Sequence, residues 1–253
     1  IDAVKAEKLG GKLYAALDGK NIESAEFYMD NEIAESGDVA AHIAVGMTLR
    51  SYKFDIYKSE KPKDEKVALL SSVHFVSFDS DLAQKNYDEQ ECIIKGMFLA
   101  RNLVNEPPNM LYPDSYAKRI KDQLKPLGVE IEILDEKKMK KLGMGALLAV
   151  GQGSDFAPRM VIMRWKGDKT NADAPLAFVG KGVTFDTGGI SIKPGAGMED
   201  MKMDMGGSAA VVGLMKSLAL RKAKANVMKI CHRRALIAPR ILLHLIPVKR
   251  LRF

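Results

Sequence analysis

Residues 179–210 read VGKGVTFDTGGISIKPGAGMEDMKMDMGGSAA and carry the clearest structural pattern in the chain. The apolar run Leu176–Val179, which leads into this stretch, is typical of a buried strand. Gly206–Leu220 has the composition of a closely packed helix. Between the two lies a glycine-rich loop. A strand, a loop and a helix in this order indicate an α/β fold, in which ligands bind beyond the carboxyl ends of strands.

Four of the charged residues in this region are candidates for a functional site: Lys181, Asp186, Lys193 and Asp204. Aspartates can act as hard oxygen ligands or bases, and lysines as cations or, when buried, as neutral amines. A hydrolytic metal site is one interpretation, and a solvated surface loop is the other. A phosphate-binding loop is not supported, because no GxxxxGK[ST] pattern occurs. The four scattered histidines do not form a zinc-type cluster, and no nucleophile elbow for a serine-histidine triad is present.

Length and composition indicate a globular protein with one large or two modest domains. The chain has 253 residues, of which 47% are hydrophobic and 28% charged. Its sequence has no run of eighteen apolar residues, so no membrane span is predicted. The two cysteines, Cys92 and Cys231, cannot form a disulfide framework, and we expect a reducing cytoplasm. The N-terminal residues read as the interior of a longer protein.

The net charge of +7 is unevenly distributed. Ten of the 39 basic residues lie between Arg221 and the C-terminus, and no acidic residue follows Asp204. The other 29 basic residues are outnumbered by the 32 acidic ones. The basic character therefore belongs to the C-terminal segment. A uniformly basic surface that binds nucleic acid is not expected.

Hydrophobic periodicity predicts helices and strands that alternate along the chain. Helices are expected at Asp2–Leu17, Val39–Tyr52, Asp81–Asn105, Pro113–Leu124, Glu136–Leu142 and Gly206–Leu220. Strands are expected at Ser24–Tyr28, Val67–Phe78, Val129–Leu134 and Leu176–Val179, with further apolar runs at Ala146–Val150 and Met160–Trp165. The pattern favours an α/β fold with a mixed, largely parallel sheet and a domain boundary near residue 80, where the long helix acts as the connector.

Several motifs together resemble the leucine aminopeptidases, the cytosol aminopeptidase family. VGKGVTFDTGGISIKP and MKMDMGGSAAVVG are similar to that family's signature. NLVNEPPNMLYP resembles its NEP-type turn, and MGALLAVGQGSDFAPRMVIMRWKG resembles the strand pair ahead of its metal loop. The resemblance extends from residue 1 to Val227. It implies a partial N-terminal α/β domain at residues 1–80, a catalytic α/β domain at 81–227 and assembly as a homo-hexamer.

The resemblance also implies a chemistry. The family uses two divalent metal ions, Mn²⁺ or Zn²⁺, to release N-terminal residues such as leucine from peptides with a free N-terminus, in the cytoplasm. Lys181 resembles a metal-ligating lysine, Asp186 the carboxylate that bridges both ions, and Asp204 a further ligand on the lysine-bearing site. Lys193 resembles the catalytic lysine that polarises the scissile carbonyl. Two ions about 3.5–4 Å apart can activate a water and hold both reacting oxygens.

Residues 228–253, MKICHRRALIAPRILLHLIPVKRLRF, depart from the family pattern. The family's second signature, an Asn-Thr-Asp-Ala-Glu-Gly-Arg stretch that carries further ligands, does not occur in the 253 residues. One interpretation is a basic tail that binds nucleic acid or anionic lipid. The favoured one is out-of-frame translation, which would make the chain an incomplete, impaired copy. A catalytically inactive remnant or a DNA-binding relative is the rival functional hypothesis.

Overall fold

The computed structural model describes residues 1–29, 37–59, 70–77, 79–170 and 175–232. The chain divides into two compact units, Ile1–Ile94 and Lys95–Phe253. The division falls inside helix α4 (Ser80–Asn105), the predicted connector, while the domain boundary near residue 80 stays a prediction. Among the described residues, no helix has both the length and the hydropathy needed to cross a membrane.

The first unit packs two helices and the start of α4 with a pair of parallel strands. Its elements are α1 (Ala3–Leu17), β1 (Ser24–Tyr28), α3 (Gly37–Ser51) and β2 (Ser72–Val76). Asp2 begins α1, because its side chain accepts a hydrogen bond from the Lys5 backbone N–H at 2.8 Å. The core contains the buried residues Ala6, Val39, Ile43 and Met47. The unit is therefore held together by the apolar faces of α1 and α3.

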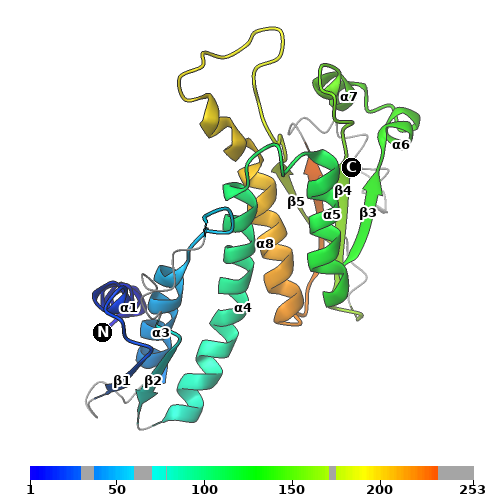
Figure 1. The fold of residues 1–253 in the computed structure, drawn as a ribbon. Helices are drawn as coiled ribbons and strands as arrows, with labels where there is room; N and C mark the ends of the chain where they lie inside the picture. Colours follow the sequence, from blue (N-terminus) through cyan, green and yellow to red (C-terminus); the bar gives the residue numbers. More distant parts are fainter. Residues whose placement is uncertain (30–36, 60–69, 78, 171–174, 233–253) are drawn as a thin grey trace. The chain divides into compact units, whose positions relative to one another are not determined.

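The second unit is built on a four-stranded sheet. Its strands are β3 (Glu130–Leu134), β4 (Met160–Lys166), β5 (Leu176–Lys181) and β6 (Asn226–His232), in the order β3-β4-β6-β5 (Figure 1). The predicted α/β class with a mixed sheet is confirmed. The β6–β5 pair is parallel, but β3–β4 and β4–β6 are antiparallel, so the parallel share is smaller than expected. Apolar runs show that a strand is buried and do not encode the direction of its neighbours.

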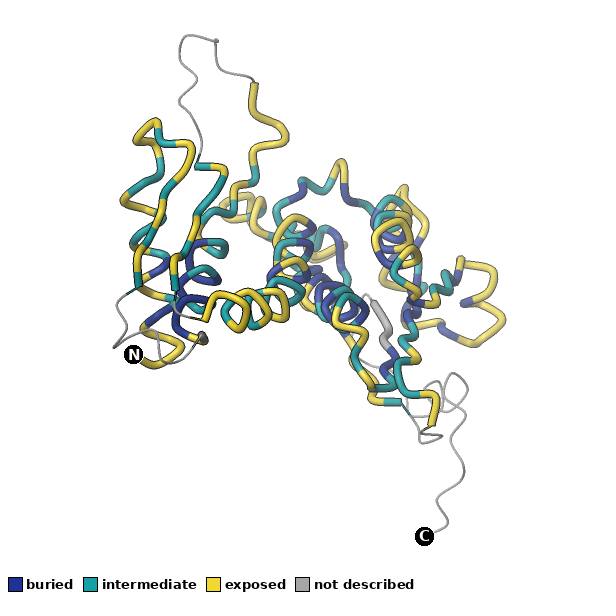
Figure 2. Tube along the Cα trace, turned by 90° about the horizontal axis from the view of Figure 1, so that it is seen from below, coloured by how far each residue is buried: buried dark blue, intermediate teal, exposed yellow. Residues whose placement is uncertain are grey.

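Helices cover both faces of this sheet. The second half of α4, α5 (Pro113–Leu124) and α8 (Gly206–Leu220) share one core with Val161 and Met163 of β4. The other core joins α6 (Glu136–Lys141) and α7 (Gly145–Gly151) with Met160 and Ile162. Alternate β4 residues thus face opposite cores, as the two-residue period of a strand requires. Along the helical parts of the trace, buried and exposed residues recur turn by turn (Figure 2).

The expected helices and strands are present except at two places, whereas strand β6 and the 3-10 segment Met198–Met205 were not expected. The run Ala146–Val150, expected as the first member of a strand pair, lies in helix α7. Five apolar residues are too few to distinguish a strand from a buried helical turn, and Ala and Leu favour the helix. β2 covers Ser72–Val76 of the predicted strand, and residues 67–69 and 78 of that prediction lie outside the described residues.

Strand β6 shows how the polypeptide continues after α8. Its residues Met228–His232, predicted as part of the basic tail, pair with β4 on one side and β5 on the other. Met228 is 2% exposed and belongs to the core with α6 and α7. The rest of the predicted tail, residues 233–253, lies outside the described residues, so its interpretation as a nucleic-acid or lipid-binding segment stays a prediction.

Candidate metal centre

The carboxyl end of β5 places Lys181 beside the first turn of α8. Gly180 makes this approach possible: a Cβ added there would lie 2.5 Å from the Gly207 carbonyl oxygen and 2.6 Å from the Cα atom of Ser208. Only glycine allows β5 and α8 to come so close. Because Asp204 lies two residues before α8, this packing also brings its side chain to Lys181.

The loop after β5 extends beyond the strand and returns to the 3-10 helix η3 (Met198–Met205), as the yellow segment of Figure 1 shows. Gly188 has a φ of +93°, where a side chain would be strained. The Gly188 N–H donates to Asp186 Oδ1 at 3.1 Å, and the Lys193 N–H donates to the Thr187 carbonyl at 2.9 Å. These contacts place Asp186 and Lys193 on the same side of the turn.

All four predicted site residues come together in one charged cluster, consisting of Lys181, Asp186, Lys193 and Asp204. The Lys181 Nζ atom lies 2.8 Å from Asp204 Oδ2 and 3.8 Å from Asp186 Oδ2. The Lys193 Nζ atom lies 3.6 Å from the same Asp186 oxygen. The side chain of Asp204 is 25% exposed and that of Lys181 is 41% exposed, so water and small ligands can reach the cluster.

Electrostatics keep Asp186 ionised. Burial raises the pKa of its carboxyl group, but the other influences together outweigh it and hold the pKa below the ordinary value. These are the side-chain contact with Asp204, the N–H of Gly188, and the positive charges of Lys193 and Lys181. Asp186 is therefore a carboxylate at neutral pH, the form that can ligate a metal ion.

Helix η3 supplies a contact that sequence reasoning missed. The Lys193 Nζ atom donates to the Met201 Sδ atom at 2.8 Å. The same helix carries Asp204, which accepts from Lys181. Each lysine of the charged cluster thus has a partner on η3, although this segment has no apolar periodicity that would have predicted its role.

A buried hydrogen bond secures the start of α8 behind the cluster. Ser208 Oγ is fully buried, donates to the Met205 carbonyl at 2.8 Å and lies 2.8 Å from Tyr116 Oη on α5. Because the serine proton is used toward Met205, Tyr116 is the donor between the two hydroxyls. The pair ties α5 to the helix that follows Asp204.

Replacing Tyr116 by phenylalanine is expected to lower the free energy of unfolding by about 1 kcal/mol, because the donor is lost while Ser208 keeps its bond to Met205. Urea unfolding measured by circular dichroism checks this. The double variant Tyr116→Phe, Ser208→Ala is the control, and its loss should be smaller than the sum of the two single losses. Additive losses would show that the hydroxyls are not coupled.

The chemical groups of the cluster fit one divalent cation. Lys181 offers an amine nitrogen, and Asp186 and Asp204 offer carboxylate oxygens, a donor set that suits Mn²⁺ or Zn²⁺. In the structure the Lys181 ammonium group provides the positive charge between the two carboxylates. The described part of the chain contains no group of three or more His, Cys, Asp and Glu with metal-binding spacing, because two of the four cluster residues are lysines.

Both units match domains of a known protein family. Residues 98–233 match the catalytic domain of the cytosol aminopeptidase family, and residues 1–61 match its N-terminal domain. The chain is 54% identical over 225 residues to a probable cytosol aminopeptidase of Rhizobium etli, covering 88% of this chain and 44% of the relative. A probable cytosol aminopeptidase of Rhodopseudomonas palustris is 59% identical over 187 residues, covering 74% and 37%. The chain thus spans less than half the length of these relatives.

Solved structures of similar proteins superpose on most of the chain. The bottromycin maturation enzyme BotP in complex with Mn superposes with a TM-score of 0.76 at 28% identity, covering 91% of this chain and 47% of that one. A mutant tomato leucine aminopeptidase superposes with a TM-score of 0.76 at 29% identity, covering 93% and 46%. The resemblance inferred from the motifs is confirmed, and the chain belongs to the cytosol aminopeptidase family.

Proposed function

We propose that the charged cluster binds a divalent metal ion and forms part of the active site of an aminopeptidase that releases N-terminal residues such as leucine. The observation that supports this most strongly is the position of Lys181 Nζ, 2.8 Å from Asp204 Oδ2 and 3.8 Å from Asp186 Oδ2. The Lys181 ammonium group thus lies where the carboxylates of Asp186 and Asp204 converge. The manganese complex of the similar enzyme BotP supports Mn²⁺ as the ion to test first.

Each residue of the cluster has a role in this proposal. Lys181 would hold the ion through its Nζ lone pair after losing a proton, and Asp204 would hold it through a carboxylate oxygen. Asp186 is the proposed bridging carboxylate, since its Oδ2 faces both lysines. When bound, divalent ions in such sites polarise a carbonyl and provide a nucleophilic water at neutral pH.

Lys193 is the proposed oxyanion-stabilising residue. Its ammonium group lies 3.6 Å from the Asp186 carboxylate. Its contact with the neutral sulfur of Met201 uses one of three N–H donors and leaves others for a substrate carbonyl. A positive group fixed at this point would stabilise the negative charge that develops on the carbonyl oxygen during hydrolysis.

The substrates we propose are peptides with a free N-terminus. A free α-amino group that enters the cluster would meet the carboxylates of Asp186 and Asp204, which favour a positively charged or metal-coordinating amine. An internal peptide bond has no such group, so cleavage would be confined to the first residue. A homo-hexamer of the intact protein remains a prediction from the family resemblance.

We expect only weak aminopeptidase activity from the chain of 253 residues. Lys181, Asp186 and Asp204 supply one ion, whereas among the described residues only Asp186 is a predicted ligand of the second. β5 also leaves apolar side chains accessible, with Leu176 66% and Phe178 39% exposed, which favours aggregation. A two-metal mechanism with one incomplete site should lose most of its rate.

Metal stoichiometry and leucine release together test the proposal. The purified chain is loaded with Mn²⁺, freed of excess metal and assayed by elemental analysis and with leucyl p-nitroanilide. We expect one ion per chain and only slow hydrolysis. The absence of bound Mn²⁺ and Zn²⁺ would contradict the proposed site. Two bound ions with rapid Mn²⁺-dependent leucine release would contradict the proposed impairment.

A further inference from the structure

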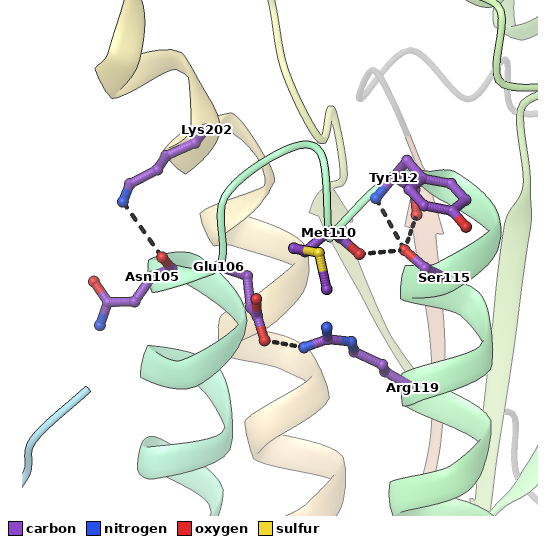
Figure 3. A network of polar contacts seen from close by, with 7 residues as sticks. All are labelled: Asn105, Glu106, Met110, Tyr112, Ser115, Arg119 and Lys202. Carbon is purple, nitrogen blue, oxygen red and sulfur yellow. Dashed lines mark hydrogen bonds and ion pairs between the residues drawn. The ribbon is translucent and has the colours of Figure 1, made fainter. Parts of the chain in front are cut away.

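Lys202 joins the helix that carries Asp204 to a distant part of the second unit. It lies in η3, and its Nζ atom donates to the backbone carbonyl of Asn105 at 3.3 Å (Figure 3). Asn105 is the last residue of α4, 97 positions earlier in the sequence. No role follows for Lys202 from the metal-ligand pattern, so the contact calls for a separate explanation.

The end of α4 is a favourable place for a donor from elsewhere in the fold. The last carbonyls of an α-helix have no partner within the helix, and they carry the negative end of its dipole. The Glu106 N–H still reaches the Asn102 carbonyl at 3.2 Å, but Pro107 and Pro108 follow and have no N–H to continue the series. The last turn of α4 also contains no basic residue. Lys202 supplies a donor and a positive charge at this end of the helix.

The turn after α4 is a firm anchor for this contact. The side chain of Glu106 is 4% exposed and forms an ion pair with Arg119 of α5. At the start of α5, Ser115 Oγ donates to the Met110 carbonyl at 2.8 Å and accepts from the Tyr112 N–H at 3.0 Å (Figure 3). Both sides of the turn are therefore tied to α5, and the Asn105 carbonyl has a defined position.

Helix η3 by contrast has little burial of its own. Met205 is its one fully buried residue, and Met203 is 47% exposed. It nevertheless carries the partners of both cluster lysines, Met201 for Lys193 and Asp204 for Lys181. The position of these two side chains consequently depends on what holds η3 in place, and Lys202 lies between them in the sequence.

We propose that Lys202 is a positioning residue, which fixes η3 against the carboxyl end of α4 and so preorganises Asp204 for metal binding. This inference rests on the proposed metal site, and it assigns a structural purpose to the two prolines of the turn after α4. Among the described residues, the ammonium group forms no hydrogen bond or ion pair with the proposed metal ligands. It acts through the backbone of η3, as groups outside the ligand set do when they orient ligands.

Two measurements on the full chain test the inference. Hydrogen exchange of residues 198–205 without metal reports the hold on η3, and titration with Mn²⁺ reports the consequence. Lys202→Met should speed exchange in this segment about tenfold and weaken Mn²⁺ binding by about tenfold, within the range known for residues that support metal ligands. The midpoint of global unfolding should stay unchanged.

Matched variants separate positioning from a general effect of charge. Lys202→Arg can still donate to the carbonyl and should restore most of the exchange protection and Mn²⁺ affinity. Lys137→Met removes an exposed lysine from α6 in the same unit and should change neither. If Lys202→Met impairs both exchange protection and Mn²⁺ affinity and Lys202→Arg restores neither, the hydrogen bond to Asn105 is not the cause.

The outcomes also separate this inference from the proposed function. Unchanged exchange of residues 198–205 in Lys202→Met overturns the inference, whether or not Mn²⁺ binds. Faster exchange throughout the unit would overturn it as well, because that result indicates general destabilisation. If the unmodified chain binds no Mn²⁺, the proposed function fails, and the exchange of residues 198–205 alone then decides whether Lys202 holds η3.

Discussion

Replacing Gly10 by alanine is expected to destabilise the first unit by about 3 kcal/mol. A Cβ atom at Gly10 would lie 2.0 Å from the Ile43 carbonyl oxygen and 3.0 Å from the Met47 backbone nitrogen. On the opposite helix, a Cβ at Gly46 would lie 1.9 Å from the Glu7 carbonyl oxygen. Backbone atoms cannot move aside as side chains do, so α1 and α3 would have to separate and their shared core would open.

The neighbouring residue offers a matched control. A Cβ at Gly11 would have Gly46 O at 3.8 Å and Arg50 Cβ at 4.0 Å as its nearest neighbours, which is ordinary contact. Gly11→Ala should therefore stabilise α1 by up to about 1 kcal/mol through helix propensity. Urea unfolding of both variants, followed by circular dichroism, should give shifts of opposite sign. Equal midpoints for Gly10→Ala and the unmodified chain would contradict the close helix contact.

Replacing Asp204 by asparagine is expected to weaken Mn²⁺ binding by at least about 100-fold, more than the loss of a residue outside the ligand set. Asparagine preserves the size of the side chain and can still accept a hydrogen bond from Lys181. It lacks the negative charge, and the nearest remaining carboxylate oxygen is that of Asp186, 3.8 Å from Lys181 Nζ. Isothermal titration with Mn²⁺ measures the loss directly.

Asp200 provides the control for this variant. It lies on the same helix η3, four residues earlier, and is exposed. Asp200→Asn removes the same charge from the same element and should leave Mn²⁺ affinity within about threefold of the unmodified chain, as expected for a screened surface charge. Equal affinities of the Asp204→Asn variant and the unmodified chain would show that the Lys181–Asp204 pair is an ion pair without a role in metal binding.

Several features of this protein could be predicted from its amino-acid sequence. The helix Gly206–Leu220 was predicted with the bounds that α8 has in the structure, because apolar and small residues continue until Arg221. The family was recognised because closely spaced Lys, Asp and Gly residues lie on a short stretch of chain, where spacing alone constrains geometry. The four members of the charged cluster were identified for the same reason.

Other features depend on contacts between residues far apart in the chain. β6 lies between β4 and β5, although its first residues follow α8 by only a short turn. Two of the three strand pairings in this four-stranded sheet are antiparallel. The run Ala146–Val150 lies in helix α7, which packs on the second face of the sheet. Apolar periodicity indicates that a face is buried, but it does not indicate which element covers it.

The same distinction applies to the candidate site. Residue types and spacing in the linear chain sufficed to select Lys181, Asp186, Lys193 and Asp204. The contact of Met201 with Lys193, and that of Lys202 with Asn105, arise only when η3 packs beside the charged cluster and the end of α4. Local sequence specifies which groups are available, whereas their partners depend on the packing of distant backbone segments, which carries no local signal.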